Sequence, residues 1–142
     1  MGKTYYLIGS LRNSQIPQVS AALRDVGINV FDSWYAAGPT ADDSWKEYEQ
    51  GRNLTYIDAL KDYAAQHVFS FDKKHLDRCD GAILVYPAGK SAHLELGYVL
   101  GQCKPGYVLL DEHKDRWDVM LNFATAVYSD LDGLITHLRG VQ

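Results

Sequence analysis

The sequence lacks the features of a secreted or membrane-spanning protein. It has only two cysteines, and Cys79 and Cys103 do not show the paired spacing of a zinc site or a disulfide framework. We therefore expect both to be reduced, buried thiols of a cytoplasmic protein. No apolar run approaches the roughly 18 residues that a membrane span needs, so we expect no membrane partner. The first residues, Met1–Thr4, lead directly into a strand-like run and do not resemble a signal peptide.

An excess of positive charge is also missing. The chain carries 14 Lys and Arg residues against 18 Asp and Glu residues, which gives a formal net charge of −4. Nucleic-acid-binding domains normally present a basic face, so we expect no nucleic-acid partner. A small anionic ligand is still compatible with this balance, because local geometry can overcome net charge. Repeats, low-complexity segments and linkers are absent as well, and 142 residues suit one domain, spanning residues 1–142.

The sequence does contain short apolar runs that alternate with helical patterns. The apolar runs predict strands at residues 4–9, 28–32, 81–87, 106–111 and 123–129. Helical spacing predicts helices at residues 16–26, 44–66 (with a break near Gly51), 71–79, 91–103 and 130–139, the last capped by Asp130. Central strands that are apolar throughout are typical of a parallel sheet covered on both faces. We therefore predict an α/β fold, a three-layer α/β/α sandwich around a five-stranded parallel sheet.

One acid, Glu95, lies inside an apolar helical pattern that follows the clearest predicted strand. Ligands of such sheets bind beyond the carboxyl ends of the strands, which is where Glu95 is expected. Ser91 is a suitable N-cap and would place Glu95 about one turn into the helix, where the helix dipole favours an ionised carboxylate. Two interpretations are open from spacing alone. Glu95 is either an ordinary acid that complements the helix dipole or a functional carboxylate at the strand edge.

Other polar side chains are predicted near the same edge. Asp72 is either a surface acid on a helix or a second functional carboxylate, and Asp80, directly before a strand, is interpreted as structural. Two carboxylates in one pocket suit glycosidic chemistry, in which one acts on the sugar carbon and the other handles the leaving group. The loop IGSLRNS, residues 8–14, offers a flexible Gly9 and several donors, so it is either a cradle for a phosphate or hydroxyl or a solvated loop.

Aromatic and histidine side chains give weaker signals. A cluster follows the second predicted strand and either stacks on a base or covers a small core; it consists of Trp34, Tyr35, Trp45 and Tyr48. His75 and His93 do not show the spacing of metal ligands, so we predict no metal site.

Three segments, taken in order, resemble a known superfamily. They are YLIGSLRN (Tyr6–Asn13), DKKHLDRCD (Asp72–Asp80) and HLELGYVLGQCKP (His93–Pro105). This set is similar to the nucleoside 2-deoxyribosyltransferase superfamily, which includes the deoxynucleoside 5′-monophosphate N-glycosidases. The resemblance implies a flavodoxin-like fold and an enzyme without a metal or organic cofactor. It also implies a glutamate that attacks C1′ of a nucleoside or nucleotide and releases the base, after which a second base (transfer) or water (hydrolysis) resolves the glycosyl-enzyme.

The resemblance implies roles for particular residues. Glu95 would be the nucleophile, Asp72 would hold or protonate the leaving base, and Tyr6 would help to position the nucleophile. The implied substrate-binding positions are Gly9, Ser10, Arg12, Gly89, Lys90, Ser91 and Asn122. The family builds its pocket between subunits, so a homodimer or higher homo-oligomer with shared active sites is implied, in which Asn122 would reach into the site of a neighbouring chain.

Two features depart from the family pattern. The transferases tend to have an aspartate six residues before the nucleophile and the monophosphate glycosidases a serine, whereas this chain has Gly89, followed by Lys90. The 5′ substituent of the sugar is therefore open, and Lys90 either binds a phosphate or is solvated. A nucleotide-binding sensor or sequestering module with little turnover is the alternative function, and an interaction domain with structural acids is a third. The second departure is the long aromatic segment 32–66, which has no counterpart in the resemblance and would form a lid or set base specificity.

Overall fold

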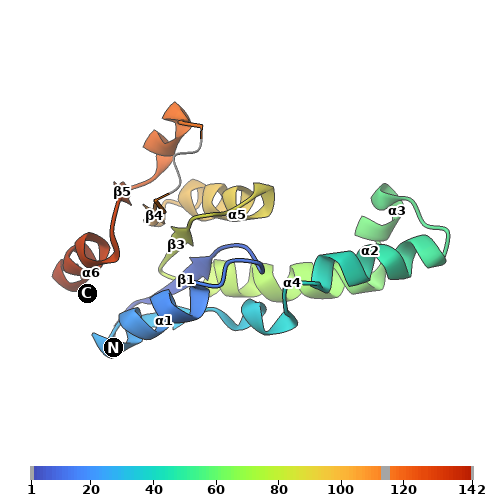
Figure 1. Cartoon of the computed structure of the whole chain (residues 1–142), viewed down its shortest axis with the longest axis horizontal. Coiled ribbons are helices and arrows are strands. Elements are labelled where there is room, and N and C mark those ends of the chain that lie inside the picture. The colour runs from blue at the N-terminus through green and yellow to red at the C-terminus, as the bar shows by residue number, and fades with distance from the viewer. Residues whose placement is uncertain (1, 113–115, 142) are drawn as a thin grey trace.

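The strands form one parallel sheet, as the apolar runs predicted. The computed structural model describes residues 2–112 and 116–141. Within these ranges the sheet has five strands in the order β2-β1-β3-β4-β5, all paired in parallel (Figure 1). Their bounds are β1 Thr4–Ile8, β2 Asn29–Phe31, β3 Gly81–Val85, β4 Gly106–Leu109 and β5 Ala126–Tyr128.

Helices cover both faces of this sheet. Their bounds are α1 Ile16–Asp25, α2 Ala41–Gly51, α3 Tyr56–Leu60, α4 Tyr63–Arg78, α5 Lys90–Gly101 and α6 Leu131–Gly140, with 3₁₀ turns η1 Ser33–Ala37 and η2 Val119–Phe123. Helices α1 and α6 lie on one face, and α4 and α5 lie on the other (Figure 1). The resulting three-layer α/β/α sandwich confirms the predicted flavodoxin-like fold class.

Strand β1 shows how the sequence separates the two cores. Successive side chains of a strand point to opposite faces of the sheet. Tyr5 and Leu7 accordingly pack against α1 and α6, whereas Tyr6 and Ile8 pack toward α4 and α5, and all four are fully buried or nearly so. A strand buried on both faces reads as a continuous apolar run, which is why this sheet was predictable.

The middle of the chain differs from the prediction of one helix at residues 44–66 and another at 71–79. Helix α2 does end at Gly51, near the predicted break. Asp62 then caps a new helix, because its side chain accepts a hydrogen bond from the Tyr63 N–H at 2.9 Å. Helix α4 continues from there for 16 residues, to Arg78. Helix α4 therefore combines the last residues of the helix predicted at 44–66 with nearly all of the helix predicted at 71–79.

Residues 41–71, which we call the arm, extend beyond the sheet. They comprise α2, α3 and the first half of α4, and Figure 1 shows them projecting to one side of the molecule. Many large apolar side chains of the arm are exposed, namely Tyr48, Tyr56, Ile57, Leu60, Tyr63, Val68, Phe69 and Phe71. None of the helices within the described ranges is long and apolar enough to cross a membrane.

The two cysteines differ in their environment. Cys79 is buried, as expected, but Cys103 is exposed, so the prediction of two buried thiols was wrong for Cys103. The helical pattern predicted that α5 would continue to residue 103 and bury its apolar face. The helix instead ends at Gly101, and Cys103 follows it with a φ of 62°, a left-handed conformation that is common just after a helix end. The side chain therefore leaves the apolar face of the helix.

Candidate active site

Tyr6, Asp72 and Glu95 meet on the α4/α5 face of the sheet, although they come from distant parts of the sequence. They lie on β1, α4 and α5 respectively. The Tyr6 hydroxyl donates a hydrogen bond to the Glu95 carboxylate, and Asp72 is near enough for its charge to act on both partners. Tyr6 is only 1% exposed, and both acids are half-buried. The structure therefore brings together all three residues that the resemblance assigned to catalysis.

Burial shifts the protonation of all three groups. Burial first, and then repulsion from Asp72, raise the pKa of Glu95 to about 7, although the Tyr6 hydrogen bond lowers it. Burial also raises the pKa of Asp72 to about 6. The pKa of Tyr6 is raised by burial and then by the charges of Glu95 and Asp72, so Tyr6 stays a hydroxyl donor at neutral pH. Because interacting acids titrate as a pair, the two carboxyls hold about one proton between pH 6 and 7.

The N-cap of the helix that carries Glu95 lies two residues earlier than predicted. Gly89, not Ser91, is the N-cap, with extended backbone (φ −102°, ψ −155°) and no side-chain cap. Since α5 starts at Lys90, Glu95 lies about one and a half turns inside it. Lys90 and Ser91 are exposed, and no atom lies within 4 Å of the position that a Gly89 Cβ would occupy. The space where the family carries its sugar-binding side chain is therefore open.

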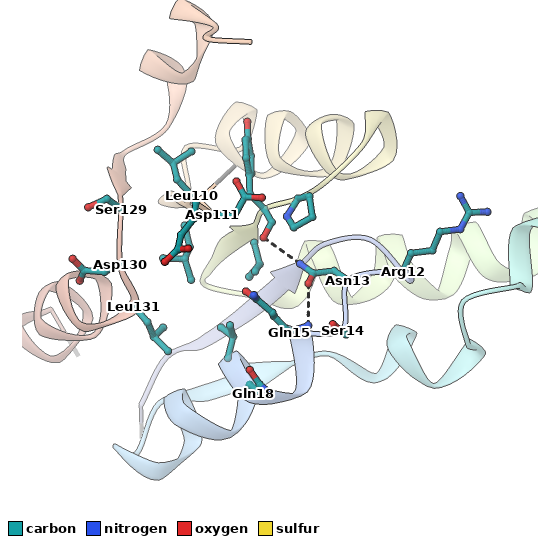
Figure 2. Close-up of a pocket in the computed structure, with 16 residues that line it drawn as sticks. Arg12, Asn13, Ser14, Gln15, Gln18, Leu110, Asp111, Ser129, Asp130 and Leu131 are labelled. Carbon is teal, nitrogen blue, oxygen red and sulfur yellow. Dashed lines mark hydrogen bonds between the residues drawn. The ribbon is translucent and has the colours of Figure 1, made fainter. Parts of the chain in front are cut away.

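The loop between β1 and α1 is held mainly by bonds within the protein. A Cβ on Gly9 would lie 2.6 Å from the Ile16 Cδ1 atom, so this glycine permits the packing of α1. The Ser10 hydroxyl accepts a hydrogen bond from the Arg12 N–H at 3.1 Å. The Arg12 guanidinium lies 3.1 Å from Asp43 on the arm and is exposed. Figure 2 shows the Arg12 side chain directed away from the other labelled residues. In this arrangement Arg12 is paired with Asp43, a carboxylate of the same chain.

A cavity of about 620 Å³ opens at the same carboxyl edge, but on the α1/α6 side (Figure 2). Its lining includes Arg12, Asn13, Asp111, Glu112 and Asp130. Tyr6, Asp72 and Glu95 are not part of this lining, so the cavity and the carboxyl pair lie on different sides of the strand edge. We take the carboxyl pair as the candidate reaction centre, because it combines two acids of raised pKa with a bound hydroxyl donor.

Two other predicted residues lie elsewhere. The Asp80 side chain accepts a hydrogen bond from the Thr4 N–H at 2.8 Å, and the Asp80 N–H donates to the Thr4 carbonyl at 2.8 Å. Asp80 therefore secures the start of β1, at the amino edge of the sheet, in agreement with a structural role. Asn122 is exposed on η2, which projects from the sheet in Figure 1, and its amide donates to the Val119 carbonyl at 2.9 Å.

The aromatic residues after β2 divide between the core and the arm. The Trp34 indole N–H donates to the Leu7 carbonyl at 2.7 Å, and the Tyr35 hydroxyl donates to the Asn13 carbonyl at 3.0 Å. Both side chains therefore cover the end of β1. Trp45 contacts Tyr56 edge to face within the arm. The structure thus favours the core-covering interpretation for Trp34 and Tyr35.

Sequence reasoning missed an aromatic wall beside Asp72. The His75 ring stacks on Phe31, with 3.9 Å between centroids and 12° between planes. Phe71 packs against both rings, and Tyr6 packs against Phe31. The available signal was the spacing of Phe71 and His75, which puts them on one face of a helix. Their partner on β2 could not be found from spacing.

A second missed feature is the contact of His93 with Tyr86, at the start of α5. The His93 Nε2 atom lies 3.1 Å from the Tyr86 hydroxyl oxygen. The sequence offered no signal for this pair. In the described part of the chain, no group of His, Cys, Asp and Glu side chains is arranged to hold a metal ion.

Comparison with known proteins gives a match among solved structures. No protein-family model and no curated protein sequence matches the chain. Among solved structures, the chain is similar to the Clostridium botulinum CMP N-glycosidase BcmB, with a TM-score of 0.52 and 15% sequence identity. The match covers 96% of this chain and 99% of that chain. By its name that protein is a nucleotide N-glycosidase, one of the activities that the sequence resemblance implied. At this identity the likeness establishes a shared fold over nearly the whole length.

Proposed function

We propose that this protein cleaves the N-glycosidic bond of a nucleoside or its 5′-monophosphate through a covalent glycosyl-glutamate at Glu95. The observation that carries this proposal is the meeting of Tyr6, Asp72 and Glu95 at one point. The motif resemblance supports it, and so does the shared fold with a protein named as a CMP N-glycosidase. The chemistry needs no metal and no organic cofactor, because carboxyl groups supply both the nucleophile and the acid.

The reaction proceeds in two displacements at C1′ of the sugar. The Glu95 carboxylate attacks C1′ and forms an ester bond, while the bond from C1′ to the base nitrogen breaks and its electron pair leaves with the base. Asp72 delivers a proton to the departing base. Water or a second base then attacks C1′, the ester bond to Glu95 breaks, and Asp72 takes up the proton that the attacking group releases. Attack by water gives hydrolysis, and attack by a second base gives base transfer.

These roles require one proton on the pair, placed on Asp72. The productive form has an ionised Glu95 and a protonated Asp72. With pKa values of about 7 for Glu95 and about 6 for Asp72, the single proton held near neutral pH lies mainly on Glu95, and the productive form is the minor one by about tenfold. The Tyr6 hydroxyl, by donating to Glu95, favours its ionised form. Tyr6 therefore increases the fraction of the pair in which Glu95 is ionised and Asp72 is protonated.

The surroundings suggest how a substrate lies. Phe71 is 44% exposed beside Asp72, so it offers a ring face to the departing base. At the sugar end, the open space at Gly89 and the exposed Lys90 leave room for a 5′-phosphate. These features favour an anionic 5′ substituent, to be tested by comparing nucleosides with their monophosphates.

We infer that the protein works as a homodimer or higher homo-oligomer with shared active sites. Apolar side chains remain exposed on the arm, and further ones flank the reaction centre or lie in the 117–123 segment: Leu94, Tyr98, Trp117, Val119, Met120 and Phe123. Such clustered apolar surface usually marks a protein interface. A neighbouring chain would then cover the site and bring Asn122 to it. Sedimentation velocity should give a dimer or larger species, which Val68→Asp combined with Phe69→Asp should dissociate. A monomeric wild type would refute the shared site.

The decisive test is base release by a Glu95→Gln variant. Purified protein is incubated with a panel of nucleosides and 5′-monophosphates, with and without a second free base, and the products are separated by chromatography. Glu95→Gln should abolish release, whereas Glu47→Gln, an exposed glutamate on α2, should leave it unchanged. Release at the wild-type rate by Glu95→Gln refutes the proposal. Tight binding without base release by the wild type would favour a nucleotide sensor.

A further inference from the structure

A single histidine closes the loop between β3 and α5. His93 is the fourth residue of α5, and its ring turns back over the start of the helix. Its Nδ1 atom lies 2.7 Å from the Gly89 carbonyl oxygen, and its Nε2 atom lies 3.1 Å from the Tyr86 hydroxyl oxygen. The His93 and Tyr86 rings also meet edge to face, with 5.7 Å between centroids. The two bonds therefore join both ends of the segment 86–89.

The chemistry of the partners fixes the tautomer of the ring. A carbonyl oxygen only accepts hydrogen bonds, so the proton of neutral His93 is on Nδ1 and is donated to Gly89. Nε2 then carries the lone pair and accepts the hydroxyl proton of Tyr86. Each ring nitrogen has a partner of the required kind, so the ring is held at both sides.

The bond to Gly89 controls the peptide that opens the helix. Gly89 is an N-cap without a side-chain cap, and the bond from the His93 backbone N–H to the Gly89 carbonyl is long, at 3.4 Å. The ring bond to the same oxygen is much shorter and holds the Gly89–Lys90 peptide plane. The first N–H groups of a helix have no intrahelical partner and are free to bind a ligand. His93 therefore sets the direction in which the Lys90 N–H group faces at the strand edge.

The bond to Tyr86 connects this segment to the neighbouring loop. The Tyr86 carbonyl accepts a hydrogen bond from the Asn13 side-chain amide at 3.3 Å, and Asn13 is only 4% exposed. The Asn13 carbonyl in turn accepts from the Tyr35 hydroxyl. Strands β1 and β3 are neighbours in the sheet, and their chains leave in opposite directions along it. The His93 contacts thus belong to one hydrogen-bonded set across the crevice where such sheets bind ligands.

We propose that His93 is a positioning residue, which fixes the β3–α5 loop through Gly89 and Tyr86 and so places the sugar against the Glu95 carboxylate. This inference rests on the proposed N-glycosidic cleavage. Glu95 follows His93 by two residues on the same helix. Attack on C1′ requires reacting atoms about 3–3.5 Å apart, and a misplacement of about 1 Å can lower the rate about 100-fold. His93 acts only through the loop that it holds.

Three substitutions at His93 separate its two bonds. His93→Ala removes both bonds and should lower kcat/KM by about 10- to 100-fold, mainly through kcat. The amide nitrogen of Asn can occupy the place of Nδ1, so His93→Asn should recover most of this loss. The Gln amide corresponds to Nε2, so His93→Gln should stay close to His93→Ala. His93 is exposed and lies outside both cores, so all three variants should stay folded, with Tm lowered only slightly by the lost hydrogen bonds. His67→Ala, an exposed histidine on α4, is the matched control and should behave as wild type.

The outcomes separate this inference from the proposed function. If Glu95→Gln is inactive but His93→Ala keeps wild-type kcat/KM, the positioning role is wrong and the cleavage function stands. If His93→Asn is as impaired as His93→Ala, the bond to Gly89 is not the cause, and the proposal is again overturned. A wild-type protein that releases no base from any member of the panel overturns both. Rescue by Asn with failure of Gln is the result that supports the proposal.

Discussion

Replacing Glu95 by glutamine should stabilise the protein while abolishing its activity, and the gain should depend on pH. The folded state raises the pKa of Glu95 from the ordinary value of 4.5 to about 7. Between these two values the folded protein binds more protons than the unfolded chain, so its free energy of unfolding falls as the pH rises. Below pH 4.5 the carboxyl is protonated in both states and has no such effect. Above pH 7 the full penalty is present, and glutamine, which cannot ionise, removes it.

The size of the effect follows from the same two values. A difference of about 2.5 pKa units corresponds to about 3 kcal/mol, at about 1.36 kcal/mol per unit. This is an upper figure, because the Tyr6 hydroxyl can still donate to the glutamine oxygen and because Asp72 titrates with Glu95. For a chain of 142 residues, a gain of about 3 kcal/mol raises Tm by roughly 10 °C.

The assay is urea unfolding of wild type and Glu95→Gln at pH 5 and pH 8, with Glu47→Gln as the exposed control. We expect the variant to exceed the wild type by about 2–3 kcal/mol at pH 8 and by much less at pH 5, with no pH-dependent difference for Glu47→Gln. A Glu95→Gln variant that is no more stable than the wild type at pH 8 would refute the reasoning, because Glu95 would then not be destabilised by burial and by Asp72. An equal gain at both pH values would show that repacking, and not ionisation, is the cause.

Three further predictions concern the reaction centre and the loop between β1 and α1. The rate of base release should peak between pH 6 and 7, with kcat/KM falling on both sides, because only the singly protonated Asp72–Glu95 pair is productive. Asp72→Asn should change the shape of this pH profile. A flat profile for the wild type would contradict the assignment of the two acids. Tyr6→Phe should lower kcat by about tenfold and move the alkaline limb to higher pH, since Glu95, the weaker acid of the pair, loses the hydrogen bond that favours its ionised form; an unshifted alkaline limb would exclude this role. Gly9→Ala should reduce stability by about 1–3 kcal/mol through its clash with Ile16, and Ile16→Val, which removes the clashing Cδ1 atom, should relieve part of this loss in a double-mutant cycle. Additive effects would mean that Gly9 is required for another reason.

The strands of the sheet could be predicted because their pattern depends on residues that are neighbours in the sequence. A strand buried on both faces needs apolar residues at consecutive positions, and β1 and β3 show this directly in the sequence. The N-cap of α6 was also readable, because Asp130 accepts a hydrogen bond from the Gly133 N–H within one turn. In both cases the residues that decide the structure are neighbours in the chain.

The arm and the start of α5 could not be predicted in the same way. Asp62 caps α4 inside a segment whose pattern predicted one continuous helix. Several other polar residues of that segment are also suitable N-caps, so the start of α4 could not be located from the sequence. Ser91 has the better side chain for an N-cap than Gly89, yet the helix begins after Gly89, where the His93 ring binds the cap carbonyl. The contacts of Arg12 with Asp43 and of Phe31 with His75 join residues far apart in the sequence, and spacing carries no information about such pairs.

The two interpretations of Glu95 that its spacing left open predict opposite shifts of its pKa. An acid that only complements the helix dipole is solvated and stabilised as an anion, so its pKa falls below the ordinary value. A carboxyl withdrawn from water beside a second acid is destabilised as an anion, so its pKa rises. The pKa of Glu95 is raised to about 7, and its first cause is burial, followed by Asp72. Such a shift destabilises the fold, which an acid that served only to stabilise a helix would not do. The direction of the shift therefore favours the functional interpretation, and titration of Glu95 by NMR in wild type and Asp72→Asn measures it directly: a value below 4.5 in the wild type would return Glu95 to the helix-dipole interpretation.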